Sequence, residues 1–231
     1  MIKSFENKIN SLTLFFKVLF MNTKNPIEDL KEIRKLMETS SKFLSLSGLS
    51  GISAGIIALL GSGYAWYIIR EFQKKQTLYY FSGTYNENIT TLDFKLMFTA
   101  LLILIFAVSF GFLFTYLTAK KKNHQLFTPI SFKLAWSLAV PLAFGGAFTF
   151  IMYYHGTFNF IGAATLLFYG MGLLNASKYV HIEIKYLALF QMTLGLLSAF
   201  FIEYSLYFWA FGFGILHIVY GTIMYLKYDR K

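Results

Sequence analysis

One histidine stands in the middle of an apolar stretch of this sequence. His217 lies near the midpoint of residues 206–226, a run that contains no Lys, Arg, Asp or Glu. A neutral imidazole in such a place can bind a metal, and because its ordinary pKa is about 6.5 it can also relay a proton. The simpler structural alternative is a neutral side chain that is hydrogen-bonded to a Ser, Thr or Tyr on a neighbouring helix. The sequence leaves both interpretations open.

Four further polar side chains lie within or beside apolar runs. Gln191 and Asn175 stand in two other runs, where we expect each to join a hydrogen-bond network between helices. Glu203 and His155 stand in turns between runs, where they are either solvated or flank a vestibule. These four residues and His217 are the candidate functional or buried polar positions, because a polar group in hydrocarbon costs several kcal/mol unless it has partners.

The sequence predicts no metal site and no cofactor. The remaining histidines, His124 and His181, lie in connections, so no two histidines share a depth at which they could hold haem. There is no cysteine and no H-x-x-x-H spacing, which removes thiolate sites and the usual helical zinc motif. We therefore assign no metal ligand and no cofactor-binding residue.

A serine near the start of the first apolar run raises an enzymatic alternative. Gly48-Leu49-Ser50-Gly51 has the G-x-S-G form, and with His217 it is reminiscent of a rhomboid-like intramembrane hydrolase. In rhomboids the serine belongs to the fourth core helix, whereas this tetrapeptide opens the first run. Hydrolysis stays a remote alternative, and no catalytic residue is assigned.

Six apolar runs hold most of these side chains. Hydrophobic residues make up 56% of the chain and aromatic residues 20%, far above soluble averages. The runs approach or exceed the roughly 20 residues that cross a bilayer, and they lack the alternation of barrel strands. We therefore predict an all-α polytopic membrane protein, with six transmembrane helices within residues 44–231. The expected spans are 44–69, 96–118, 134–154, 157–176, 186–202 and 206–226.

The chain before the first run has two parts. Residues 1–25 are poorly specified: 12–20 are apolar but too short to span, so residues 1–20 are either an interfacial anchor or translated upstream sequence before a start at Met21. Residues 26–43 are predicted to form an amphipathic cytoplasmic helix, capped by Asn25 and beginning at Pro26. This helix either lies on the membrane or contacts a cytoplasmic partner protein.

Charge predicts the orientation of the chain. With six spans both termini share one side, and 17 of the 21 Lys and Arg residues fall on that side; the other four lie in a long loop expected over residues 70–95. Basic residues favour the cytoplasm, so both termini are expected there. The net charge of +10 is explained by lipid headgroups, and no nucleic-acid-binding module is present. The composition resembles that of an AT-rich bacterium, which favours the inner membrane.

Small residues predict where helices meet. They recur at spacings of three and four in the first and sixth spans, which we expect to pack antiparallel and to bring Ser53 or Ala54 to the depth of His217. Pro141 is expected to act as a hinge in the third span. The helix-packing positions are Ser47, Gly51, Ala54, Ala58, Ala210, Gly214 and Gly221.

Several motifs resemble those of a known group. They are the runs 43–51 (FLSLSGLSG), 168–170 (FYG), 175–179 (NASKY) and 216–221 (LHIVYG). The chain after residue 20 resembles an uncharacterised family of bacterial inner-membrane proteins with six transmembrane helices and no assigned activity. The resemblance implies the fold and topology, and it implies no mechanism.

Two classes of function follow. The first is a non-enzymatic regulatory, sensory or scaffolding membrane protein, with residues 26–43 as its contact for a partner and a homo-oligomer as a further option. The second is a small-solute or ion transporter or channel, with His217 as a proton-sensitive group inside the membrane. No inverted repeat is evident in the sequence, and such repeats are the usual pointer to transport.

Overall fold

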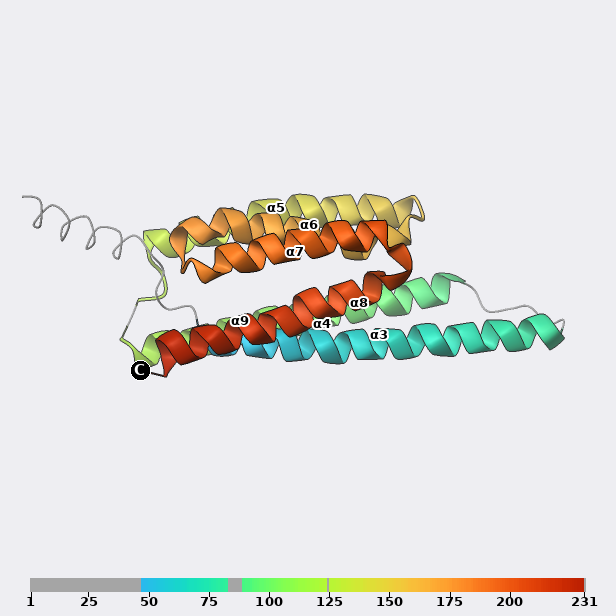
Figure 1. Ribbon diagram of the computed structural model, residues 1–231, viewed down its shortest axis with the longest axis horizontal. Helices are drawn as coiled ribbons and strands as arrows, with labels where there is room; N and C mark the ends of the chain where they lie inside the picture. Colours follow the sequence, from blue (N-terminus) through green and yellow to red (C-terminus); the bar gives the residue numbers. More distant parts are fainter. Residues whose placement is uncertain (1–46, 83–88, 124, 231) are drawn as a thin grey trace, which may run out of the picture. The chain divides into compact units, whose positions relative to one another are not determined.

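The computed structural model describes residues 47–82, 89–123 and 125–230, and in this part of the chain every regular element is helical (Figure 1). The segments 1–25 and 26–43 lie outside the described residues. The long helices are α3 (Gly48–Ser82), α4 (Ile89–Lys121), α5 (Pro129–Tyr154), α6 (Ile161–Ala176) and α7 (Glu183–Phe200). The last helical run consists of α8 (Ser205–Trp209), η4 (Ala210–Leu216), α9 (His217–Met224) and η5 (Tyr225–Asp229). Short 3₁₀ turns are η1 (Phe158–Phe160), η2 (Ser177–Tyr179) and η3 (Ile202–Tyr204).

Five of the described helical segments are long and apolar enough to cross a membrane. They cover residues 48–75, 92–121, 129–154, 158–179 and 202–229. The predicted all-α class and the multi-pass membrane character are therefore confirmed. Helix α7, which has 18 residues and carries Glu183, Lys185 and Gln191, is not among the five.

The prediction of a long loop over residues 70–95 was wrong. Helix α3 continues past residue 69 to Ser82, and α4 begins at Ile89, so helix replaces most of that loop. Glu71 and Lys75 form an ion pair one helical turn apart, with Lys75 Nζ 3.3 Å from Glu71 Oε1. Such residues end an apolar run without ending a helix, because both have good helix propensity.

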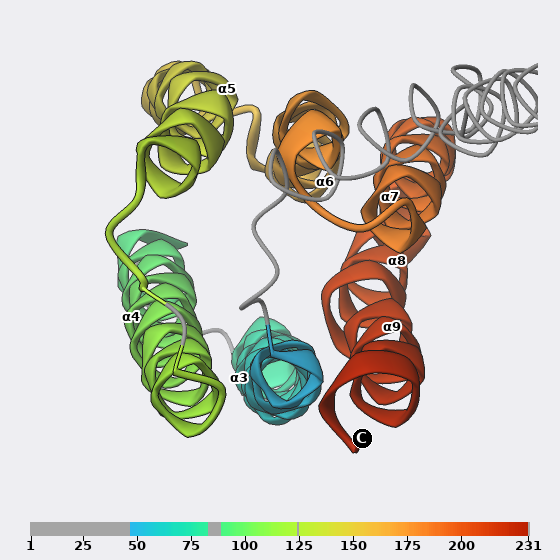
Figure 2. The same cartoon turned by 90° about the vertical axis from the view of Figure 1, so that its left-hand side faces the viewer.

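Each helix of residues 47–230 packs against particular neighbours. Helix α4 packs against α3, and α3 packs against the last helical run. That run also contacts α7, while α6 lies between α7 and α5. Viewed end-on, α4, α3 and α8–α9 form one row and α5, α6 and α7 form the other (Figure 2). A cluster of buried apolar side chains lies where α6 and α7 meet; it includes Leu173, Ala176, Val180, Ile184 and Leu187.

Polar contacts define one end of this bundle, which we call the Asp229 end. The carboxylate of Asp229 accepts hydrogen bonds from the backbone N–H of Gly48 (2.7 Å) and from Nζ of Lys122 (2.9 Å). Glu183 Oε1, on the first residue of α7, lies 2.5 Å from Nζ of Lys227. The start of α3, the end of α4, the start of α7 and the end of the last helical run therefore meet here.

The opposite end is called the Glu203 end. There the hydroxyl of Ser198 donates to the hydroxyl of Ser205 over 3.0 Å, which ties the last turn of α7 to the first turn of α8. Glu203 lies in η3, the turn between these two helices. Helix α7 thus runs from the Asp229 end to the Glu203 end, and the last helical run returns.

Glycines set the contact between α3 and α9, which pack antiparallel. A Cβ atom on Gly221 would lie 2.5 Å from the backbone nitrogen of Ile52 and 2.6 Å from the carbonyl oxygen of Gly48. A Cβ atom on Gly51 would lie 3.0 Å from the Cα of Gly221 and 3.3 Å from the carbonyl oxygen of His217. The two backbones therefore touch, and Gly51 lies at the depth of the turn between His217 and Gly221.

Of the other predicted packing positions, Gly214 lies on the same contact between α3 and the last helical run. It faces Gly55, which was not predicted: a Cβ atom on Gly55 would lie 2.6 Å from the carbonyl oxygen of Gly214. Ser53 and Ala54 lie between Gly51 and Gly55 in sequence, and therefore close to the depth of His217. Three further positions belong to the same helices: Ser47 and Ala58, which are buried, and Ala210, which begins η4.

Helix α5 runs without interruption through Pro141. It extends from Pro129 to Tyr154, and the hydroxyl of Thr128 caps it by accepting from the backbone N–H of Ser131. Packing against α6 holds the helix beyond the proline: Gly145 is buried against Phe168. The hinge role of Pro141 stays a prediction.

Candidate functional site

His217 is buried, with 5% of its surface exposed, and both of its ring nitrogens have partners. The hydroxyl of Tyr169 on α6 lies 2.8 Å from Nε2, and the carbonyl oxygen of Gly212 lies 3.0 Å from Nδ1. A carbonyl oxygen only accepts, so Nδ1 carries the hydrogen. In the neutral imidazole Nε2 then accepts from the tyrosine hydroxyl.

Gln191 brings the third helix to this site. Its side chain is fully buried, and Nε2 donates to the same carbonyl oxygen of Gly212 over 2.8 Å. Gln191 Nε2 also lies 3.4 Å from Nδ1 of His217, while Oε1 is buried without a hydrogen-bond partner among the described residues. We call Tyr169, Gln191, Gly212 and His217 the His217 cluster; it joins α6, α7 and the last helical run.

The carbonyl of Gly212 belongs to the π-helical segment η4, in which backbone hydrogen bonds span five residues instead of four. Its oxygen also lies within hydrogen-bond distance of Gln191 Nε2 and His217 Nδ1. Gly212 also needs to lack a side chain, because a Cβ atom there would lie 2.6 Å from Gln191 Oε1 and 2.6 Å from Leu166 Cδ2. π-helical turns occur frequently at functional sites.

Aromatic rings connect the His217 cluster to the Glu203 end. The ring of Phe213 lies 5.0 Å from that of Tyr169 and 5.9 Å from that of His217. On its other side the Phe213 ring lies 4.8 Å from the ring of Trp209. These are contact distances for aromatic pairs, so the cluster and Trp209 form one packed stack.

Trp209 also lines a cavity of about 650 Å³ in the half of the bundle at the Glu203 end. Residues of α3, α4, α5, α6 and α8 form its wall, which is mainly apolar. Asn159 and Glu203, which are exposed residues of the turns η1 and η3, belong to the same wall, so the cavity reaches the surface at this end. The cavity and the His217 cluster thus share the last helical run.

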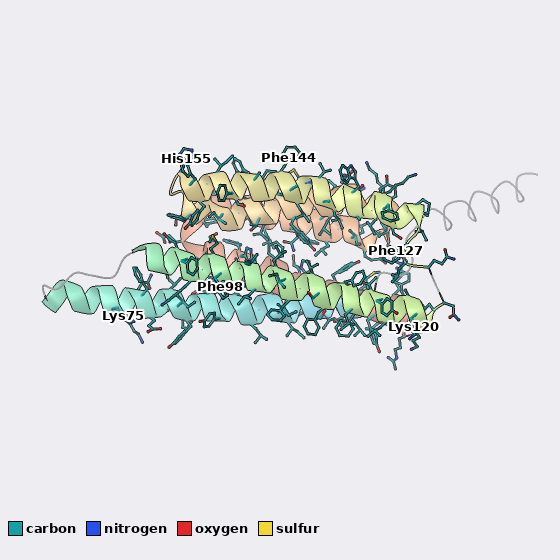
Figure 3. All side chains as sticks on the ribbon, turned by 180° about the vertical axis from the view of Figure 1, so that it is seen from behind. Lys75, Phe98, Lys120, Phe127, Phe144 and His155 are labelled. Atoms are coloured by element: carbon teal, nitrogen blue, oxygen red, sulfur yellow. The ribbon has the colours of Figure 1, made fainter. Side chains whose placement is uncertain are left out.

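The remaining candidate residues lie apart from the His217 cluster. Asn175 Nδ2 donates to the carbonyl oxygen of Ser137 over 3.2 Å, which links α6 to α5. Glu203 belongs to the cavity wall. His155 follows the last turn of α5 (Figure 3) and is exposed. Its ring packs edge-on against that of Tyr154 at 5.4 Å. Of the five predicted positions, the structure brings together only His217 and Gln191.

The serine and histidine of the hydrolase alternative have other partners. The hydroxyl of Ser50 donates to the carbonyl oxygen of Ser47 over 2.5 Å. Both ring nitrogens of His217 are taken up by Tyr169 and Gly212. The geometry contains no Ser50–His217 hydrogen bond of the kind that activates a serine nucleophile.

Two groups of the His217 cluster were missed by sequence reasoning. Tyr169 lies inside an apolar run, where tyrosine is common in this chain and carries no specific signal. The carbonyl of Gly212 depends on a π turn, for which the sequence offers no marker beyond the glycine itself. In the part of the chain that the structure describes, no three His, Cys, Asp or Glu residues are grouped as metal ligands.

Comparison of the chain with protein-family models, with curated proteins and with solved structures finds no match in any of the three.

Proposed function

We propose that this protein is a non-enzymatic membrane sensor. In this proposal a small, largely apolar molecule binds in the cavity at the Glu203 end, and the last helical run transmits its presence to the Asp229 end. The observation that carries the proposal is that Trp209 belongs both to the cavity wall and to the aromatic stack that leads to the His217 cluster.

The π-helical segment η4 provides an element with two arrangements. If η4 converts to α-helix, the residues on one side of it rotate by about 100° relative to those on the other for each π turn lost, because the extra residue that the wider turn accommodates then adds one helical step. The carbonyl of Gly212 would then leave Gln191 and His217, and Asp229 would shift against Gly48 and Lys122. Occupation of the cavity biases this equilibrium if it favours one position of Trp209.

We propose that a sixth span, residues 186–202, is formed mainly by α7, with Glu183 outside the membrane at the Asp229 end. Helix α7 runs from the Asp229 end to the Glu203 end, and the returning segment 202–229 is long enough to cross a membrane. The 18 residues of α7 rise about 27 Å, close to the roughly 30 Å of hydrocarbon. Residues 47 and 230 then lie on one side of the membrane.

We propose that the Asp229 end is cytoplasmic and the membrane a bacterial inner membrane. Basic residues favour the cytoplasm. At the Glu203 end the basic residues of α3 and α4 are Arg70, Lys74, Lys75 and Lys95. Twice as many described basic residues belong to the connections and helix ends at the Asp229 end: Lys120, Lys121, Lys122, Lys133, Lys178, Lys185, Lys227 and Arg230. The cavity then faces the outer half of the bilayer.

The output of the sensor is proposed to pass to a cytoplasmic partner protein through residues 26–43. Deleting these residues should abolish co-purification of that partner while the bundle keeps its melting temperature. An unchanged set of co-purifying proteins would remove this part of the proposal.

Ligand binding can be tested with the tryptophan of the cavity as reporter. The chain has three tryptophans, so replacing Trp66 and Trp136 by Phe leaves Trp209 alone. In lipid nanodiscs, 1-bromododecane, an apolar quencher, should quench Trp209 fluorescence to a saturating level. Ala100→Phe, which fills the cavity, should remove the saturable part, whereas Ala147→Phe, on an exposed residue of α5 outside the wall, should not. Quenching that rises linearly in all three proteins overturns the proposal.

Transmission needs a second measurement at the other end. Because the chain has no cysteine, Arg230→Cys accepts a single environment-sensitive dye. Its emission should change with the same saturation curve as the Trp209 quenching. Saturable quenching of Trp209 without any change at residue 230 would leave a binding protein without the proposed signal.

A transporter or channel is the second candidate, favoured by the buried polar cluster below a cavity. Here His217 would act as the proton-sensitive group. A pH-dependent flux in liposomes that His217→Ala alters without lowering thermal stability would support transport over sensing.

A further inference from the structure

We propose that the ligand of the cavity at the Glu203 end is a hydrophobic organic cation, such as a bulky amine or an onium ion. This inference rests on the proposed binding role of the cavity and adds the charge of its occupant. It is carried by three properties of the described wall: its volume, its charged groups and its aromatic rings.

The volume suits a molecule of drug size. Cavities that hold such ligands measure about 300–1,000 Å³, and the cavity of about 650 Å³ falls within that range. Small side chains border the space, among them Ala65, Gly146 and Thr165, and no atom lies within 4 Å of a Cβ at Gly146. A compact body with several apolar groups would fill it.

The charged side chains of the described wall are all acidic. Asp93 of α4 and Glu203 of η3 are carboxylates, and the described residues that line the cavity include no Lys, Arg or His. The nearest cations in sequence point elsewhere: Lys95 is exposed, and the guanidinium of Arg70 lies 5.3 Å over the ring of Trp66. Neither belongs to the wall. Two carboxylates in the wall, of which that of Glu203 is exposed, favour a cation and repel an anion.

Aromatic rings add a second preference for positive charge. Phe150, Tyr153, Phe158 and Trp209 line the cavity, and the rings of Tyr153 and Phe158 meet edge to face at 5.4 Å. The negative faces of such rings attract organic cations, and quaternary ammonium groups are recognised in this way. A hydrophobic cation therefore satisfies the apolar wall, the rings and the carboxylates together.

The test compares three probes of nearly equal shape and different charge. They are tetraphenylphosphonium, neutral tetraphenylsilane and the tetraphenylborate anion, each offered to the protein in phosphatidylcholine nanodiscs with empty nanodiscs as background. Saturable binding of the phosphonium ion is expected, with the neutral probe at least about tenfold weaker, since it gains nothing from the carboxylates. The borate ion should show no saturable binding.

Variants of the wall residues test whether Asp93 and Glu203 cause the preference for a cation. Asp93→Asn and Glu203→Gln should each weaken phosphonium binding by about tenfold. Glu71→Gln is the matched control, because Glu71 of α3 lies at the same Glu203 end of the bundle but pairs with Lys75 outside the cavity. It should leave the affinity unchanged. A melting curve for each variant checks that the protein is folded, and the three probes on the unmodified chain decide the charge preference independently of the variants.

The outcomes separate the two proposals. Equal affinity for the phosphonium ion and the silane overturns the charge inference and leaves the binding role of the cavity intact, and so does tighter binding of the borate. If none of the three probes saturates, both the inference and the proposed binding role fail. Equal loss of affinity in Glu71→Gln and Asp93→Asn would also overturn the inference, since the effect would then come from the general charge of that end.

Discussion

Tyr169 donates a hydrogen bond to Nε2 of His217 over 2.8 Å and thereby joins α6 to α9. The carbonyl of Gly212 fixes the tautomer of the neutral ring, because it requires the hydrogen on Nδ1 and leaves Nε2 as the acceptor. A group of the last helical run that could carry charge thus has a partner at each ring nitrogen. The hydrogen bond between Tyr169 and His217 stabilises the fold, and its contribution to the free energy of unfolding can be measured.

Tyr169→Phe removes the donor and leaves Nε2 of His217 buried without a partner. We expect the free energy of unfolding to fall by about 1–2 kcal/mol, since hydrogen bonds between membrane helices are worth about that much at most. Thermal unfolding in detergent measures the loss. Tyr186→Phe, on an exposed tyrosine of α7, is the control and should be neutral. Equal melting temperatures for the two variants would contradict this account of the cluster.

Gly221→Ala should destabilise the bundle by about 1–3 kcal/mol, because the new Cβ atom would collide with backbone atoms of Gly48 and Ile52. Backbone cannot rotate away as a side chain can, so α3 and α9 must separate. Gly63→Ala provides the matched control: no atom lies within 4 Å of a Cβ there, and alanine favours helix by up to about 1 kcal/mol. The two substitutions should therefore shift the melting temperature in opposite directions. A shift in the same direction would argue against direct contact of the two backbones.

Asp229→Asn should cost about 2 kcal/mol. The Asp229 side chain is 6% exposed, pairs with Lys122 and accepts from the first N–H of α3. Removing its charge weakens the ion pair and the interaction with the N-terminal end of the helix dipole. Glu71→Gln, which breaks an exposed pair, should change the melting temperature little. The prediction fails if both substitutions have the same small effect.

Glu183 should make stability depend on acid pH. Burial raises the pKa of its carboxyl, but hydrogen bonds from Lys227 and Tyr228 and the charge of Lys227 outweigh burial, so the pKa lies below its ordinary value of 4.5. A lowered pKa means that the carboxylate stabilises the fold fully above pH 4.5 and that this contribution is lost as the pH falls through that value. Melting temperatures between pH 6 and pH 3.5 should fall less in Glu183→Gln than in the unmodified chain. Parallel curves would refute the assignment.

Hydropathy located a helix at each apolar run, because membrane crossing demands both the apolar length and the helical hydrogen bonds. It did not find where α3 ends, since Glu71 and Lys75 mark the limit of the apolar run while remaining good helix formers. Hydropathy reports the surrounding solvent, and helix length depends on backbone hydrogen bonds that continue into water.

The candidate site was predictable in part. His217 and Gln191 stood out because polar groups are rare in apolar runs, and the structure joins them. Their shared acceptor is a backbone carbonyl in a π-helical segment, which no residue type announces. The cavity was not predictable either. It depends on how residues of α3, α4, α5, α6 and α8 come together, and that is decided by tertiary packing.

The cap that Asp229 provides for α3 has a consequence for the order of events during synthesis. Gly48 and Asp229 are 181 positions apart, so the ribosome makes the start of α3 long before its partner. At about 5–20 residues per second, the amino end of α3 waits on the order of ten seconds or more for its carboxylate. The earliest described helix to enter the bilayer is thus completed by a residue translated 181 positions later, and a nascent chain stalled before Asp229 would hold that helix end open to chaperones and proteases.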